Sequence, residues 1–125
     1  MSKLLDLLLR PELPNVAKEL PEARCKVKRL SRLAGEDVVF TLRALPYGRV
    51  QEIKELQEDA ALTILLSGLA DPDPKAPELK ERYGGATPAE TLKALLLPGE
   101  IEDLSREVEK LSGYRADTIQ KLKNA

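Results

Sequence analysis

Cys25 is the residue best suited to nucleophilic chemistry in this chain, and it lacks the partner that such chemistry needs. It is the only cysteine, and the 125 residues include no histidine that could take up its proton. A thiol without an activating neighbour is mostly protonated at neutral pH. The absence of histidine also excludes His-based catalytic triads and imidazole metal sites. We therefore interpret Cys25 as a packed or solvated thiol, and we expect no catalytic residue and no enzymatic activity.

Two aspartates, Asp71 and Asp73, could bind a divalent cation through their carboxylates. They lie in the segment ADPDPKAP, where three prolines stiffen the loop and no further ligands follow at the spacing of a calcium loop. A single cysteine forms neither an internal disulfide nor a thiolate zinc cluster. No glycine-rich phosphate-binding motif occurs either. The sequence thus predicts no metal site and no cofactor.

The composition favours a helical protein with an aliphatic core. The chain is 42% hydrophobic but only 3% aromatic, and leucine dominates its apolar residues; leucine and the charged residues favour helix. The net charge is -1, with 20 basic and 21 acidic residues, so no overall field attracts nucleic acid or an anionic membrane. No apolar run approaches the roughly 20 residues of a membrane span, and Asp6 and Pro11 cut the first one too short for a signal peptide. We expect the protein to stay in the cell that makes it.

Residues 1–24 are predicted to be a leucine-rich arm and a proline-rich connector. Ser2 can cap a short helix that Pro11 ends. The apolar side chains of this helix are Leu4, Leu5, Leu8 and Leu9. The connector that follows contains three prolines within eleven residues, which favours extended backbone. Two interpretations remain open: the arm folds back onto the core, or it is a docking segment that a partner orders.

Residues 25–125 are predicted to form one compact domain that begins with a β-hairpin over residues 25–45. Val38, Phe40, Leu42 and Ala44 alternate with Val39, Thr41 and Arg43. This period of two, rich in β-branched residues, is typical of a strand. Residues 25–32 are expected to pair with it as the first arm. That arm is basic, which suits a solvated sheet face or a lysine-protected edge better than a nucleic-acid stripe.

Helices are predicted over residues 46–124. Apolar spacing favours one long or two short helices up to Gly68, and then a short helical piece that stops at Gly84. Thr87 and Glu90 form a capping-box pattern around Pro88, so a helix begins there.

Pro98 and Gly99 should break this helix before a second one, which has an apolar seam. The seam residues are Ile101, Leu104, Val108 and Leu111. A last helix is expected after Asp117, with Ile119 and Leu122 facing inward. The predicted fold class is α+β, mainly α, with a small N-terminal hairpin packed against about four to six short helices.

Three segments together resemble the XkdN-type tail assembly chaperones of PBSX-like prophages and related long-tailed phages. They are KRLSRLAGEDVVFTLRALPYGRVQEI (28–53), YGGATPAETLKALLLPGEIEDL (83–104) and KLSGY (110–114). The resemblance covers about residues 25–122, and the opening SKLLDLLLR is also similar. It implies a non-enzymatic chaperone in the host cytoplasm that binds the long helical tape measure protein during tail morphogenesis and is absent from the mature virion. It also implies a longer, frameshifted form of the chain in many of these phages.

The arm residues Leu4, Leu5, Leu8 and Leu9 are our candidates for partner binding, because a proline-rich connector separates their apolar stripe from the core. The alternative function is a small structural component of the tail that stays in the virion. A weaker third option is a nucleic-acid-binding regulator that uses the basic hairpin arm. Neither nucleic acid nor membrane is an expected partner.

Overall fold

The computed structural model of the chain describes residues 2–13, 18–56, 58–114 and 117–123. In chain order, the elements are α1 (Lys3–Leu8), β1 (Glu22–Lys26), α2 (Lys28–Ala34), β2 (Val39–Arg43), α3 (Arg49–Leu56), α4 (Ala60–Gly68), β3 (Leu69–Asp71), α5 (Pro77–Tyr83), α6 (Pro88–Leu95) and α7 (Pro98–Leu111). The predicted class, α+β and mainly α, is confirmed. The described residues hold seven helices: α1 in the arm and six in the domain, which agrees with the predicted four to six.

The three strands form an antiparallel sheet in the order β1-β2-β3. The first pairing sets Glu22 opposite Arg43, Ala23 opposite Leu42, Arg24 opposite Thr41, Cys25 opposite Phe40 and Lys26 opposite Val39. The alternation predicted for the second strand is confirmed, because Phe40 and Leu42 are only 3% and 0% exposed. The third strand was not predicted; it pairs Leu69 with Leu42. The predicted hairpin is therefore two strands of a larger sheet.

The prediction that residues 25–32 form the first arm of the hairpin is wrong after Lys26, because residues 28–34 form helix α2. The Ser31 hydroxyl donates to the carbonyl of Val27 at 2.8 Å and accepts the N–H of Val38 at 2.8 Å, which ties the helix to the start of β2. Gly35 ends the helix with a φ of 77°, a left-handed conformation that suits glycine. The turn chemistry at Gly35 therefore closes a helix within the connection between two strands.

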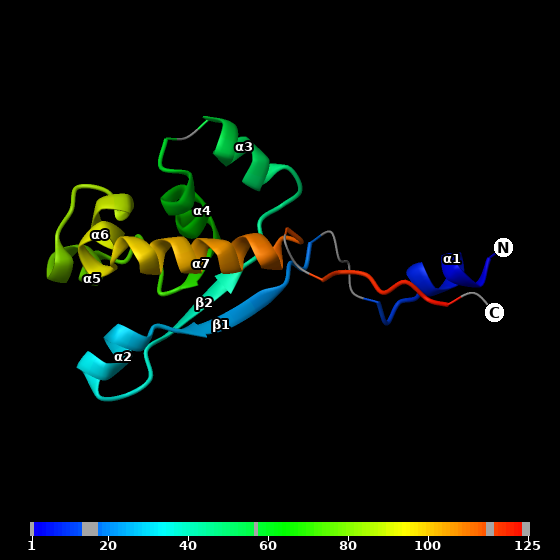
Figure 1. Cartoon of the computed structure of the whole chain (residues 1–125), viewed down its shortest axis with the longest axis horizontal. Helices are drawn as coiled ribbons and strands as arrows, with labels where there is room; N and C mark the ends of the chain where they lie inside the picture. Colours follow the sequence, from blue (N-terminus) through cyan, green and yellow to red (C-terminus); the bar gives the residue numbers. More distant parts are fainter. Residues whose placement is uncertain (1, 14–17, 57, 115–116, 124–125) are drawn as a thin grey trace.

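Helix α7 is the centre of the core, where it packs against α4 and against the sheet (Figure 1). The predicted seam is confirmed: Ile101, Leu104 and Val108 are buried and Leu111 is half-buried. Gly68 of α4 permits a close approach, since a Cβ built on it would lie 2.7 Å from a methyl group of Val108. Apart from Phe40, the buried core cluster is aliphatic, as the composition predicts.

The joint between α6 and α7 follows the predicted capping signals in part. The Thr87 hydroxyl accepts the N–H of Glu90 at 3.2 Å, which confirms the N-cap. The Glu90 carboxylate accepts the N–H of Ala86 rather than that of Thr87. Pro98 and Gly99 lie in the first turn of α7, where a missing N–H costs no hydrogen bond. The helical backbone is therefore interrupted between Leu95, where α6 ends, and Pro98, where α7 begins.

Two further predictions concern the helices after the hairpin. The segment up to Gly68 forms two short helices, α3 and α4, and Gln57 between them lies outside the described residues. The predicted last helix is wrong for residues 117–123, which have no regular structure. Ile119 and Leu122 are 84% and 75% exposed rather than inward-facing. An isolated segment of this length does not sustain a helix without packing.

Candidate client-binding surfaces

The N-terminal arm carries the four predicted partner-binding residues on helix α1. The Ser2 hydroxyl caps this helix by accepting the N–H of Leu5 at 3.0 Å, as predicted. The exposed fractions of Leu4, Leu5, Leu8 and Leu9 are 64%, 42%, 58% and 67%. Leu7 and Leu13 add further exposed apolar surface. The arm thus presents leucine side chains to solvent along its described length.

Helix α1 lies apart from the body of the protein (Figure 1). None of its residues is buried, so the folded-back arrangement left open by the sequence is not the one seen here. Residues 14–17 of the predicted connector lie outside the described residues. A helix of six residues is far below the length of roughly 12 to 15 at which isolated helices become marginally stable. Contact with another apolar surface would stabilise it.

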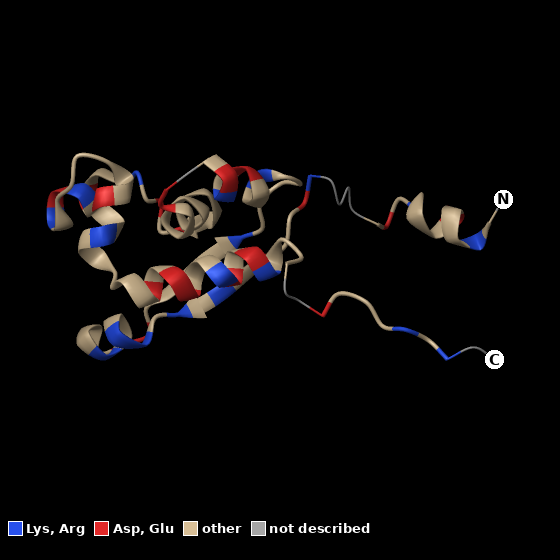
Figure 2. Cartoon of the chain, turned by 45° about the horizontal axis from the view of Figure 1, so that its top comes forward, with Lys and Arg blue, Asp and Glu red and all other residues tan. Residues whose placement is uncertain are grey.

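An apolar groove lies at the end of the domain from which the arm leaves. We call it the basal groove; it is lined by Leu20, Pro21, Ala44, Leu45, Pro46, Tyr47, Gly48, Leu111, Ser112, Gly113 and Tyr114, with a volume of about 390 Å³. The connector enters the first strand here, and the chain after α7 leaves from the same end (Figures 1 and 2). Arm, groove and C-terminal segment therefore share one end of the molecule.

Local structure fixes the two walls of the basal groove. The N–H of Arg49 donates to the carbonyl of Pro46 at 3.0 Å, and Gly48 takes a φ of 82° in this turn. The turn displays Tyr47 at its tip, where the side chain is fully exposed. On the other wall, the Ser112 hydroxyl accepts the N–H of Leu45 at 2.9 Å, which joins the end of α7 to the end of the sheet.

An ion pair fastens α2 to the joint between α6 and α7. Arg29 donates to both carboxylate oxygens of Glu100 at 3.0 and 2.9 Å, and also to the carbonyl of Leu95 at 3.0 Å. The hydrogen bonds from Arg29 hold the pKa of Glu100 below its usual value, and the N–H of Leu97 contributes through a further bond at 2.7 Å. The same carboxylate raises the pKa of the Arg29 guanidinium. The pair therefore holds α2 against the joint between α6 and α7.

A second ion pair involves a buried carboxylate. Glu109 of α7 is 5% exposed, and Lys54 of α3 forms an ion pair with its Oε1 atom. This oxygen accepts no geometrically ideal hydrogen bond within the described residues, but the lysine charge lies directly against it. Removing the lysine would leave a buried charge uncompensated. We therefore assign Lys54 to the attachment of α3 to the core.

The residues considered for chemistry lie apart from one another. Cys25 is half-buried on β1, and burial, followed by the charge of Glu107, raises the pKa of its thiol. Asp71 ends β3, and the exposed Asp73 accepts the N–H of Lys75 at 2.9 Å. Within the described ranges, no group of three or more potential metal ligands gathers. No helix in those ranges combines the length and apolarity needed to cross a bilayer.

The short helix predicted in the arm is present, whereas the basal groove was not predicted. Tyr47 and Tyr114 are far apart in the chain. They line one groove because the end of α7 lies against the end of β2, where Ser112 and Leu45 are hydrogen-bonded. No signal in the PYG (46–48) and SGY (112–114) stretches shows that the two line one groove. The role of Leu4, Leu5, Leu8 and Leu9 in binding stays a prediction.

Comparison with known proteins identifies the family to which the chain belongs. Residues 56–125, more than half of the chain, match the family model described as phage XkdN-like tail assembly chaperone protein. No curated protein matches the sequence. The crystal structure of the protein YqbN is similar in fold, with a TM-score of 0.57 and 24% identity over 82% of this chain and 93% of that one. The chain belongs to the family of phage XkdN-like tail assembly chaperone proteins.

Proposed function

We propose that this chaperone binds the tape measure protein during tail morphogenesis and catalyses no reaction. The observation that carries the proposal is the exposed leucine arm, which leaves the domain at the end that holds the basal groove, in a chain that belongs to the tail assembly chaperone family. A long helical client exposes apolar stripes before the tail tube surrounds it. Such stripes fit an amphipathic helix and an apolar groove.

The contact with each client segment is expected to be weak and repeated. Full burial of a leucine side chain contributes about 1.5 to 3 kcal/mol, and the arm leucines already hide part of their surface. Ordering the arm and losing free motion on association oppose binding. Several chaperone copies along one client would raise the overall avidity without a tight single contact. Weak single contacts would also let the chaperone leave as the tube polymerises.

Co-expression with the longest helix-rich protein encoded downstream tests the proposal. The chaperone should keep that protein soluble and co-purify with it. The double variant Leu5→Ser/Leu8→Ser should lose most of the capture, because it removes two exposed apolar side chains of the arm. A circular dichroism spectrum must show that the fold is retained.

The matched control is Leu56→Ser/Leu97→Ser, which removes two leucines that are 71% and 52% exposed on the domain. It should capture the client as the natural chain does. Unchanged capture by a folded arm variant would refute the role of the arm. Mass spectrometry of purified particles distinguishes the alternative: a chaperone should be missing, whereas many copies of the chain would indicate a structural component.

A further inference from the structure

Strand β1 lies at one edge of the sheet. It pairs with β2 on one side, and Figure 1 shows none of the described segments along its other side. Ala23 and Cys25 lie opposite core residues of β2, yet they are only half-buried. An uncovered edge presents unpaired backbone groups that a further strand can bind. We call this open side the β1 edge and define it by residues 20–26.

The hydrogen bonds to β2 show which backbone groups point to the β1 edge. The N–H of Ala44 donates to the carbonyl of Pro21 at 2.8 Å, and the N–H of Val27 donates to that of Val38 at 3.0 Å. In an antiparallel ladder, hydrogen-bonded residues alternate with residues whose N–H and C=O point the opposite way. The even-numbered residues of β1 therefore face the edge, and their backbone groups form no hydrogen bond with the described part of the chain. They are Glu22, Arg24 and Lys26.

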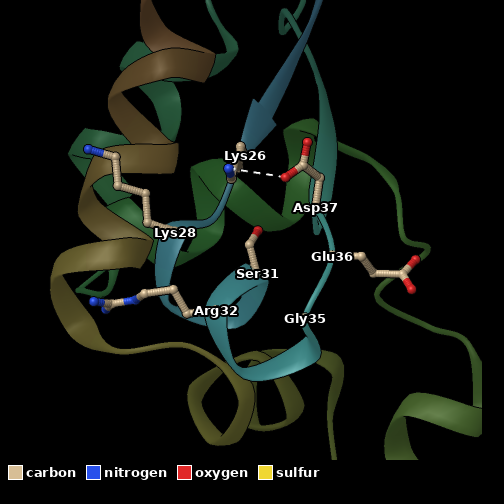
Figure 3. Close-up of a pocket in the computed structure, with 7 residues that line it drawn as sticks. All are labelled: Lys26, Lys28, Ser31, Arg32, Gly35, Glu36 and Asp37. Atoms are coloured by element: carbon tan, nitrogen blue, oxygen red, sulfur yellow. Dashed lines mark ion pairs between the residues drawn. The ribbon is translucent and has the colours of Figure 1, made fainter.

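The exposed side chains of the β1 edge include one cation without an acidic neighbour. Lys26 forms an ion pair with Asp37 at 3.0 Å (Figure 3). Glu22 lies 3.5 Å from Arg43 of β2. Arg24 enters no ion pair among the described residues, and its neighbour on β2 is uncharged. A strand on the open side would therefore be favoured if it placed an acid opposite Arg24.

A second copy of the same strand supplies that acid. Only residues that face the edge can form hydrogen-bonded pairs across a new ladder, so two antiparallel copies of β1 have few registers open to them. With Glu22 opposite Arg24, both charged pairs of the dimer join opposite charges, and Leu20 lies opposite Lys26. Each of the other registers that pair edge-facing residues of β1 sets like charges opposite each other. Charge therefore selects one register.

The proline before the strand does not interrupt this ladder. Pro21 shares the orientation of the odd-numbered residues, so the N–H that it lacks would face β2 and not the edge. Leu20 faces the edge again, and its backbone groups form no hydrogen bond with another described residue. The ladder between two copies can therefore extend from Leu20 to Lys26.

We propose that the chain forms a two-fold dimer through the β1 edges of two copies. Glu22 of each copy lies opposite Arg24 of the other, and the two Ala23 residues face each other at the two-fold axis. The three-stranded sheets of the two copies join into one six-stranded sheet. The cations of the edge repel most other strands, which makes the pairing selective. The dimer does not depend on the proposed function, but it would bring two leucine arms to one client.

Sedimentation equilibrium of the full chain measures the dimer directly. The mass should rise with concentration toward twice the 13.8 kDa of one chain. Glu22→Arg and Arg24→Glu should each weaken the dimer about tenfold or more, because each turns two attractions into repulsions. The double variant Glu22→Arg/Arg24→Glu should restore it, since opposite charges then face each other again. A double variant as weak as the single ones would refute this register.

The matched control is Glu81→Arg on α5, which changes the net charge as Glu22→Arg does, at another exposed glutamate. It should dimerise as the natural chain does. Urea unfolding must show that each variant is still folded. A natural chain that stays monomeric up to about 1 mM, or equal weakening in the α5 control, would overturn the inference.

A disulfide cross-link tests the register without a change of charge. In Ala23→Cys/Cys25→Ser, the two new thiols face each other in a non-hydrogen-bonded pair, where Cα atoms lie about 4.5 Å apart, within the range of a disulfide. Mild oxidation should convert this variant into a covalent dimer. The natural Cys25 residues of two copies lie four positions, or about 13 Å, apart along the strands, so they should not cross-link. Cross-linking of the natural chain alone would contradict the register.

An extended segment of the client is the other occupant that the β1 edge would accept. If the natural chain is monomeric and Arg24→Glu loses capture of the downstream protein, the edge binds the client and this inference fails. If the natural chain dimerises but captures nothing, the proposed function fails and the dimer stands.

Discussion

Glycine-to-alanine substitutions at Gly68 and Gly99 should change stability in opposite directions. Both glycines lie in helices, at the end of α4 and in the first turn of α7. A Cβ at Gly68 would lie 2.7 and 2.8 Å from the two methyl groups of Val108 and 2.9 Å from the carbonyl oxygen of Arg43. A Cβ at Gly99 would meet nothing within 4 Å. The substitution therefore adds a methyl group where the space is already occupied, at Gly68, and where it is open, at Gly99.

The magnitudes follow from the two environments. Val108 is fully buried and β-branched, and Arg43 contributes backbone of β2, so neither neighbour yields easily. Overpacking of this kind costs about 1 to 3 kcal/mol, and the helix propensity of alanine returns at most about 1 kcal/mol. We expect Gly68→Ala to lower the free energy of unfolding by about 1 to 2 kcal/mol. Gly99→Ala should raise it by about 0.5 kcal/mol.

Urea unfolding followed by circular dichroism measures both values. With a slope of about 2 kcal/mol per molar, Gly68→Ala should move the midpoint down by about 0.5 to 1 M. Combining it with Val108→Ala should cost less than the sum of the two single variants, because the removed methyl groups free space for the new one. A Gly68→Ala chain as stable as the natural one would show that α4 and α7 do not pack as closely as described.

Two further predictions use the titrating groups. The Glu100 pKa is lowered in the folded state, so its contribution to stability is present above the unfolded value of about 4.3 and is lost as the pH falls through the folded value. The Glu100→Gln chain should therefore lose less stability than the natural chain as the pH falls through that range. Urea midpoints at several pH values measure this. An equal loss in both chains would refute a stabilising role of the Arg29–Glu100 ion pair. Burial raises the pKa of Cys25, so iodoacetamide should alkylate the folded chain several-fold more slowly than the urea-unfolded chain at pH 8. Equal rates would contradict its partial burial.

The parts of the fold that depend on neighbouring residues could be predicted from the sequence. The caps at Ser2 and Thr87 are bonds to an N–H three residues away, so the local pattern suffices. The seam of α7 likewise depends only on helical spacing. These predictions are confirmed because no distant segment competes with them.

The errors arise where distant contacts decide the structure. The basic segment 25–32 was expected to pair with the second strand, but residues 28–34 form a helix that Ser31 ties to the start of β2 and Gly35 ends. Strand β3 has only three residues and exists because β2 offers it a partner, which no local pattern reveals. Ile119 has the spacing of a buried helix residue but meets no core. Of the surfaces, the arm is contiguous in sequence and was predicted, whereas the basal groove is assembled from three separate segments.

The exposed tyrosine at the turn tip also has a spectroscopic use. The chain contains three tyrosines and no tryptophan, so its ultraviolet emission comes from tyrosine alone. Tyr47 and Tyr114 line the basal groove, whereas Tyr83 ends α5. In a Tyr83→Phe chain, every remaining intrinsic fluorophore would stand at the groove. Binding of a tyrosine- and tryptophan-free client peptide there could then be followed without attaching a dye, since the emission would report the groove and no other part of the protein.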